Sequence, residues 1–222
     1  MSRSRSRLLY FTLQNVIKHT DLDSGHKIWL THTNISEEVL LKEVKLTDDE
    51  IKLLSDISGK RRRKEFLAVR YLIQQQYGND EFISYDENGK PGLSFSNKKI
   101  SISHSGELEA VITHPTLEVG IDLQHYTEKI MRVNQRFLSE EEFKDTKGEI
   151  WKTLVYWCAK EALFKYYALG NVDFRKELFV EPFKMDNSGL IKGLIFKGEN
   201  PIEVDLHFEK YDDYMLVYTL NT

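Results

Sequence analysis

The sequence lacks the features of a disulfide-stabilised, membrane-spanning or strongly nucleic-acid-binding protein. Its single cysteine, Cys158, excludes an internal disulfide framework and a thiolate metal cluster. No apolar run approaches the roughly 20 residues that cross a membrane. Acidic residues number 35 and basic residues 31, and the net charge of −4 does not indicate nucleic-acid binding. What remains is a globular chain of 222 residues, long enough for one large domain or two small ones.

Several catalytic signatures are also missing. The sequence contains no G-x-S-x-G elbow, H-E-x-x-H helix, P-loop or dinucleotide fingerprint. The seven histidines do not have zinc-ligand spacing. Ser103, His104, Ser105 and Asp122 invite comparison with a hydrolase triad. Adjacent strand residues point to opposite faces, so His104 is badly placed to activate either neighbouring serine.

The first twenty residues are basic and rich in serine, and no acidic residue precedes Asp21. This composition is typical of an organelle transit peptide, and it also fits a short signal-like stretch. We favour a simpler interpretation, a frayed N-terminus ahead of an early strand. The chain is accordingly expected to be cytoplasmic.

Periodicity, capping motifs and turn residues predict an α+β fold. The expected helices cover residues 36–44, a segment that begins at 47, 60–77, a short segment from 139 and 149–169. The expected strands cover 26–33, 99–103, 108–113, 119–124, 178–185, 193–197, 202–208 and 214–220. Helices followed by runs of strands argue against a doubly wound parallel sheet. They favour two similar lobes, 1–117 and 118–222, each with one long helix and a small, mostly antiparallel sheet.

The longest predicted helix contains the unusual stretch Trp157-Cys158-Ala159-Lys160-Glu161-Ala162-Leu163-Phe164-Lys165. Lys160 and Glu161 share a stripe with two large aromatic residues, and Lys165 lies one turn beyond Glu161. One interpretation is an ordinary, partly exposed ion pair between Glu161 and Lys165. The other is an acid and two bases that face a polyanion and its metal ion.

Charged residues elsewhere bear on that choice. In 119–124 the side chains alternate, so Gly120, Asp122 and Gln124 share one face of a strand. Cations occur in the run from Lys60 to Lys64 and at Lys90. Mg²⁺ is typically held by one or two carboxylates, waters and phosphate oxygens. Asp122 and Glu161, together with these cations, therefore suit a site that handles a pyrophosphate.

Four segments carry a family resemblance: GKPGLSFSNKKISISHSG (89–106), VGIDLQ (119–124), RFLSEEEF (136–143) and WCAKEALFK (157–165). In order and spacing they resemble the motifs of the surfactin-type (Sfp-type) 4′-phosphopantetheinyl transferases. The resemblance covers about residues 60 to 170. It implies a two-lobed α+β pseudodimer with coenzyme A in the cleft between the lobes.

The implied reaction is magnesium-dependent transfer of 4′-phosphopantetheine from coenzyme A to a serine of an apo acyl or peptidyl carrier protein. Adenosine 3′,5′-bisphosphate would be released, as in a holo-carrier-protein synthase. Two fused lobes would remove the need to dimerise, so a monomer is expected. No nucleic-acid or membrane partner is implied.

The resemblance also assigns roles by position. Asp122 and Glu161 would ligate Mg²⁺, and Glu161 would help to deprotonate the incoming serine. Lys160 would contact the pyrophosphate and assist proton transfer, and Lys165 would bind phosphate beside it. The remaining coenzyme A contacts would come from Ser103, His104, Lys90 and, in the basic run, Arg62 with Lys60 and Arg61 as neighbours.

One position departs from the family pattern. Gln124 stands where the family usually has glutamate, which removes one negative charge from the site. Gln124 would still coordinate through its amide oxygen or a water, and weaker or less selective metal binding is expected. The departure also keeps an alternative open: a catalytically impaired module that binds coenzyme A or a carrier protein. The presence of Lys160, Glu161 and Lys165 together argues for the enzyme.

Overall fold

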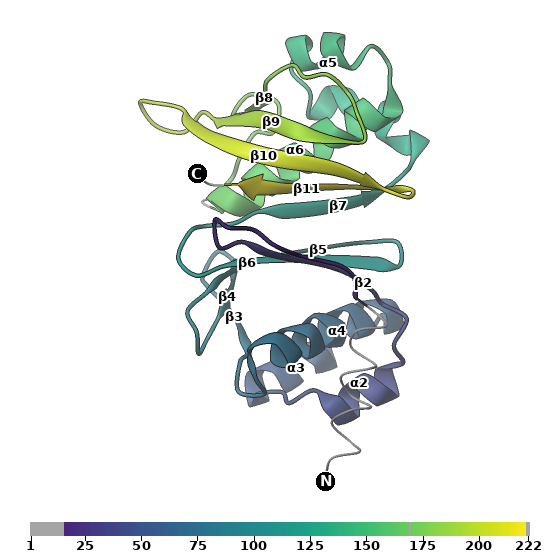
Figure 1. The fold of residues 1–222 in the computed structure, drawn as a ribbon, viewed down its shortest axis with the longest axis vertical. Helices are drawn as coiled ribbons and strands as arrows, with labels where there is room; N and C mark the ends of the chain where they lie inside the picture. The colour runs from purple at the N-terminus through teal and green to yellow at the C-terminus, as the bar shows by residue number, and fades with distance from the viewer. Residues whose placement is uncertain (1–15, 169, 221–222) are drawn as a thin grey trace.

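The computed structural model describes residues 16–168 and 170–220. The basic segment over residues 1–15, and the expectation of a frayed N-terminus, lie outside these ranges. The described chain has an α+β fold with two antiparallel sheets (Figure 1). None of the described helices combines the length and the apolar character that crossing a membrane demands.

The first sheet, sheet A, is built mainly from the N-terminal half of the chain. Its strands, in spatial order, are β1 (Val16–Asp21), β2 (Lys27–His32), β6 (Leu108–His114), β5 (Lys99–Ser105), β4 (Pro91–Leu93) and β3 (Ile83–Tyr85). Strand alternation sends Trp29, Ile100 and Val111 to one face, where they pack against the longest helix of this half. The opposite face is left for sheet B.

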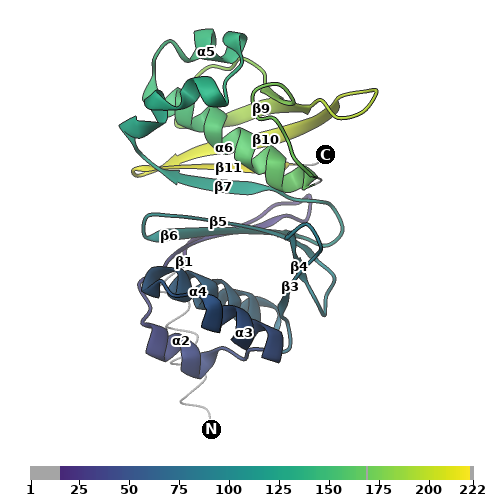
Figure 2. The same ribbon diagram turned by 180° about the vertical axis from the view of Figure 1, so that it is seen from behind.

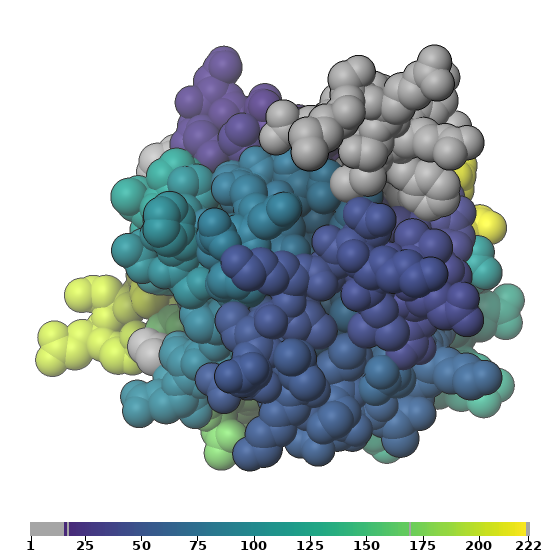
Figure 3. Space-filling view, turned by 90° about the horizontal axis from the view of Figure 1, so that it is seen from below, coloured from purple at the N-terminus to yellow at the C-terminus, as the bar shows by residue number. Residues whose placement is uncertain are grey.

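Three helices lie on the outer side of sheet A: α2 (Glu37–Glu43), α3 (Asp48–Asp56) and α4 (Lys60–Tyr77). Helix α4 packs on the sheet, and α2 and α3 pack on α4. Helix α3 begins at the predicted capping box, in which Thr47 and Glu50 each accept a hydrogen bond from the other's backbone N–H. Helix α4 ends at Gly78 as predicted. Seen from below, the blue surface of these helices closes this end of the molecule (Figure 3).

The second sheet, sheet B, belongs to the C-terminal half. Its strands, in spatial order, are β7 (Ile121–His125), β11 (Tyr214–Leu220), β10 (Ile202–Tyr211), β9 (Ser188–Ile195) and β8 (Leu178–Val180). Helix α6 (Ile150–Tyr167) packs along its outer face (Figure 2). The short helices η1 (Glu128–Arg132), η2 (Asn134–Arg136) and α5 (Glu140–Thr146) lead into α6.

The two sheets face each other across a shared apolar core. Its buried side chains come from both sheets: Ile28, Leu30, Ala110 and Ile112 from sheet A, and Ile121, Leu123, Leu216 and Tyr218 from sheet B. The order of layers is therefore helices, sheet A, sheet B and α6 (Figure 1). This packing brings β5 against β7, where the candidate site lies.

Several predicted boundaries were wrong. The strand predicted over 178–185 is only β8, and the strand predicted over 193–197 begins earlier, at Ser188, and ends at Ile195. Helix α6 ends earlier than predicted, at Tyr167, where Ala168 takes a left-handed conformation with φ of 49°. The predicted strand over 99–103 continues to Ser105. The alternation predicted for 119–124 is confirmed, since Ile121 and Leu123 point into the core between the sheets.

Candidate active site

Asp122 is the centre of the candidate site. It lies on β7, the edge strand of sheet B, and its side chain is only 9% exposed. Its Oδ1 accepts hydrogen bonds from Ser103 Oγ at 2.8 Å and from Lys165 Nζ at 2.7 Å. Lys165 Nζ also donates to the Ile121 carbonyl at 2.8 Å. The ammonium group of Lys165 thus forms an ion pair with Asp122, the carboxylate predicted to ligate a metal ion.

Glu161 lies one helical turn before Lys165 on α6. Burial raises the pKa of Glu161 to about 7, the charge of Asp122 adds to the rise, and Lys165 opposes it. These three side chains therefore form one electrostatic cluster. Lys165 forms its ion pair with Asp122, 43 residues away in sequence, which favours the second of the two interpretations of this helix.

The edge of β7 is held by a ladder of serine side chains from β5. An edge strand presents backbone N–H groups that need acceptors. The acceptors are serines at every second position of β5, namely Ser101, Ser103 and Ser105. Their Oγ atoms accept hydrogen bonds from the backbone N–H groups of Ile121, Leu123 and His125, at 3.2, 3.1 and 2.9 Å respectively. The ladder fixes β7 against sheet A and turns the Ser103 hydroxyl toward Asp122.

Gly120 sets the distance between β7 and α6. A Cβ at this position would lie 1.9 Å from the carbonyl oxygen of Ala162. Only glycine permits so close an approach of the two backbones. The contact brings the α6 face that carries Glu161 and Lys165 against Asp122.

The structure does not bring Lys160 to this cluster. Its side chain is fully buried, and Nζ donates to Glu142 Oε2 at 2.7 Å. Nζ also reaches three carbonyl oxygens within 2.8 Å, those of Phe137, Phe174 and Leu178. Consecutive helix residues differ by about 100° in direction, so Lys160 points toward α5 while Glu161 points toward β7. The structure therefore places Lys160 in a buried ion pair with Glu142, away from the cluster in which its pyrophosphate contact was expected.

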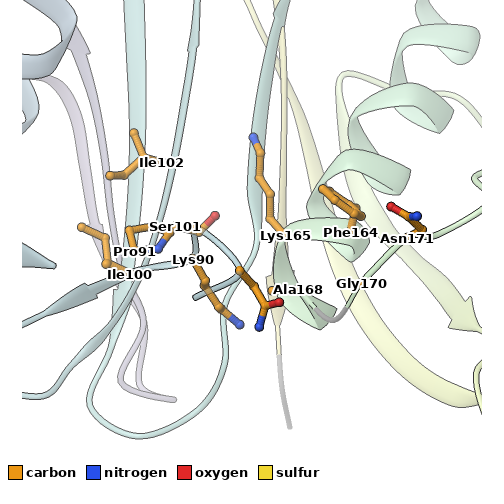
Figure 4. Close-up of a pocket in the computed structure, with 12 residues that line it drawn as sticks. Lys90, Pro91, Ile100, Ser101, Ile102, Phe164, Lys165, Ala168, Gly170 and Asn171 are labelled. Carbon is orange, nitrogen blue, oxygen red and sulfur yellow. The ribbon is translucent and has the colours of Figure 1, made fainter. Parts of the chain in front are cut away.

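A cavity of about 500 Å³ adjoins the cluster. Sheet A and the turn before β4 contribute Lys90, Pro91 and Ser101, and α6 contributes Phe164 and Lys165 (Figure 4). We call it the first pocket. Lys90 holds the turn to α6, because its Nζ donates to the Tyr166 carbonyl at 3.0 Å, and it also pairs with Glu118 at 2.5 Å.

A second pocket of about 370 Å³ lies between α4 and the strands β5 and β6. It shares Pro91 and Ile102 with the first pocket, and its lining includes Arg62 and His104. Of the other predicted phosphate contacts, Lys60 is exposed at the start of α4. Arg61 is exposed too, and its Nε bonds Glu65 at 2.7 Å. The structure thus places Arg62, the preferred residue of the basic run, in a pocket, and leaves its two neighbours outside the lining.

The residues around Asp122 fit a hard divalent cation. Mg²⁺ needs only one or two protein carboxylates, and Asp122 and Glu161 supply two. The Gln124 amide nitrogen donates to the His125 carbonyl at 3.1 Å and to Ser105 Oγ at 3.4 Å, which leaves its amide oxygen to coordinate. Within the described residues no group of three or more His, Cys, Asp or Glu side chains is arranged to hold a metal. Substrate oxygens and water would therefore have to complete the coordination.

Sequence reasoning missed the two acids of the second pocket, Glu65 and Glu109. Both are buried, at 7% and 1% exposure. The only sequence signal was an acid at residue 109 within an otherwise buried strand. Cys158 lies in the core of the C-terminal half. Burial raises the pKa of its thiol well above the usual range, so Cys158 is not a nucleophile.

Comparison with known families bears on the half of the chain that contains Asp122 and Glu161. Residues 118–218 match the 4′-phosphopantetheinyl transferase superfamily. The match spans β7 to β11 with α6, slightly less than half of the chain. It supports a transferase that handles phosphopantetheine. No curated protein matches the chain.

Proposed function

We propose that the protein transfers 4′-phosphopantetheine from coenzyme A to a serine of an apo carrier protein, as a transferase of the surfactin type. The observation that carries this proposal is the convergence of Asp122, Glu161 and Lys165 beside a pocket, inside the segment that matches the superfamily. The division at residue 117/118 into two lobes of a monomeric pseudodimer, with a cleft between them, belongs to the same proposal.

The two pockets suit two parts of coenzyme A, the phosphate of the nucleotide and the pyrophosphate. At the second pocket, the Arg62 guanidinium and the His104 ring provide hydrogen-bond donors for the nucleotide phosphate. Lys90 lies at the first pocket, beside the shared residue Pro91. Lys165, also in the first pocket, binds the pyrophosphate. The substrate would therefore extend from α4 along β5 to the Asp122 cluster.

In the proposed step, the oxygen of the carrier serine attacks the pyrophosphate phosphorus that bears the pantetheine arm. The bond from that phosphorus to the bridging oxygen breaks, and adenosine 3′,5′-bisphosphate leaves. Glu161 takes the serine proton, directly or through water, and Lys165 neutralises charge on the leaving group. Asp122 and Glu161 would hold Mg²⁺, which when bound stabilises negative charge on the phosphate oxygens.

The carrier protein is proposed to dock beside α5. Phe137, although aromatic, is 2% exposed and belongs to the core, so it offers no contact surface. Phe143 is 43% exposed and lines a shallow pocket with Lys144 and Arg175. An exposed aromatic side chain in a pocket lined by two cations and one acid, Glu140, suits a partner that combines an apolar patch with acidic groups.

A mass measurement tests the proposed function. The protein would be incubated with apo carrier proteins, coenzyme A and Mg²⁺, and the carrier would gain the mass of one phosphopantetheine. Asp122→Asn and Glu161→Gln should abolish the gain, while Glu203→Gln, at an exposed carboxylate on β10, should not. Coenzyme A binding without any mass gain across several carriers would favour the alternative, a binding module that has lost catalysis. Near-full turnover by Glu161→Ala would exclude Glu161 as a metal ligand.

Gln124→Glu tests the departure from the family pattern. A third carboxylate would strengthen metal binding, so half-maximal transfer should need several-fold less Mg²⁺. An unchanged Mg²⁺ dependence would show that Gln124 does not coordinate the metal. Gln124→Ala is the matched control for loss of the amide.

A further inference from the structure

The second pocket has a polar floor under apolar walls. Phe66, Val69, Pro91 and Ile102 line its sides, and Glu109 lies among them on β6. Arg62 and His104 belong to its outer part, since Arg62 is exposed and the His104 side chain is 45% exposed. A phosphate would meet the Arg62 guanidinium and the His104 ring at this rim, and a flat apolar group would fit between the walls.

Glu109 is unusual because its buried carboxyl group makes no hydrogen bond to any part of the chain that the structure describes. The residue is 1% exposed, and neither carboxylate oxygen has a hydrogen-bond partner within the residues that the structure describes. A buried polar group without a partner is costly, and proteins rarely keep one without a reason. Arg70 lines the same pocket, and its Nη2 likewise lacks a partner in the described chain.

Burial and the neighbouring Glu65 favour the neutral form of the Glu109 carboxyl group. Burial raises its pKa well above the usual range, the nearby Glu65 adds to the rise, and Lys64 opposes it. His104 is its cross-strand neighbour on β5, and it lies 3.5 Å from the Glu65 carboxylate. A neutral carboxyl group offers one hydrogen-bond donor and one acceptor side by side.

We propose that Glu109 is a specificity-determining residue that recognises the adenine base of the nucleotide, pairing its carboxyl group with the exocyclic amine and the adjacent ring nitrogen. The amine donates to the carboxyl oxygen, and the carboxyl O–H donates to the ring nitrogen. This inference rests on the proposed function only for the identity of the nucleotide. A phosphate bound at the rim and a base bound at the floor would together explain three features of the pocket. These are Arg62 and His104 at the rim, the apolar walls, and the carboxyl group of Glu109, which has no hydrogen-bond partner in the described chain.

Binding of two nucleotides, measured by calorimetry, tests the inference. Adenosine 3′,5′-bisphosphate has the exocyclic amine, and purine riboside 3′,5′-bisphosphate lacks it. The wild-type protein should bind the adenosine compound about tenfold more tightly, because the second compound leaves the carboxyl oxygen of Glu109 without a donor. Glu109→Gln should keep this preference, since an amide also offers a donor and an acceptor. Glu109→Leu should lose it and bind both compounds equally.

The matched control is Glu107→Leu, at an exposed position outside the pocket lining, which should leave the preference unchanged. Removal of an unpartnered acid should not unfold the protein, so the melting temperature of Glu109→Leu should equal or exceed that of the wild type. The wild-type preference should weaken as rising pH ionises Glu109, while that of Glu109→Gln stays constant.

The outcomes separate this inference from the proposed function. If Glu109→Leu kept the tenfold preference, or if the wild-type protein had none, the role of Glu109 would be overturned even with transfer intact. Preference lost in Glu109→Leu and kept in Glu109→Gln would support that role, even if the carrier gained no mass and the proposed transfer failed.

Discussion

Lys160 offers the sharpest test of structure against sequence, because the two give it different roles. The motif predicts that its ammonium group contacts pyrophosphate, whereas the structure buries it in an ion pair with Glu142. Lys160→Met keeps the length and the apolar stem of the side chain and removes only the ammonium group. If Lys160 serves only to pair with Glu142, this change should destabilise the fold and leave coenzyme A binding intact.

The size of the effect follows from the groups that lose a partner. Removal of one member of a buried ion pair costs about 3–5 kcal/mol, because the other charge stays buried and uncompensated. Glu142 would keep two backbone donors, the N–H groups of Ser139 and Val180 at 2.7 and 2.9 Å, which limits that penalty. The three carbonyl groups that also lose a donor add to it. We expect the free energy of unfolding to fall by about 4 kcal/mol.

Urea unfolding followed by tryptophan fluorescence measures this loss, and calorimetry measures coenzyme A binding by the folded variant. Lys160→Met combined with Glu142→Gln should regain about 1–2 kcal/mol, because no charge is then left unpaired. Lys176→Met, at a lysine whose side chain is 80% exposed, is the control and should change stability little. Unchanged stability together with a tenfold loss of coenzyme A affinity would refute the structural role and restore the predicted one.

Three further predictions concern the packing, the acid stability and the metal site. Gly120→Ala should lower the free energy of unfolding in urea by about 2–3 kcal/mol, because the new Cβ would collide with the Ala162 carbonyl oxygen. An unchanged free energy of unfolding would contradict the close approach of β7 and α6. Burial, aided by the neighbouring His114, lowers the pKa of His26 from 6.5 to about 4. The stability that neutral His26 contributes above pH 6.5 should therefore be lost as the pH falls from 6.5 toward 4, and the loss should be about 2 kcal/mol at pH 5. His26→Gln should flatten this loss, and an unaltered pH profile would count against it. Lys165→Met removes the ammonium group that pairs with Asp122, so the protein should bind Mn²⁺ about three- to tenfold more tightly, as measured by titration with electron paramagnetic resonance. Weaker Mn²⁺ binding would show that Lys165 does not compete with the metal ion for Asp122.

Local signals in the sequence were enough for most elements of the fold. The capping boxes at Thr47 and Ser139 begin helices where predicted, because a cap depends only on residues three positions apart. The alternation around Asp122 placed it correctly opposite Ile121 and Leu123, because a strand has a period of two. The short strands β1 and β3 were missed, because neither has a comparably strong local pattern.

Partners far apart in the sequence were beyond such reasoning. The helix motif placed Lys160 and Glu161 together in one stripe, although the two side chains point in different directions on α6. Which direction meets β7 depends on the close contact at Gly120, and which lysine is buried depends on Glu142. Both contacts join segments that a linear pattern does not connect.

By itself the sequence determined most of the elements, the pair of carboxylates at Asp122 and Glu161, and the resemblance from which their role is proposed, because each of these depends on residue identity and short spacing. Only the tertiary structure decided that Lys165, and not Lys160, reaches Asp122, and that Glu109 lines a pocket with no hydrogen-bond partner among the described residues. The physical reason is that the pairing of a buried charge depends on which surfaces the packed sheets and helices bring together.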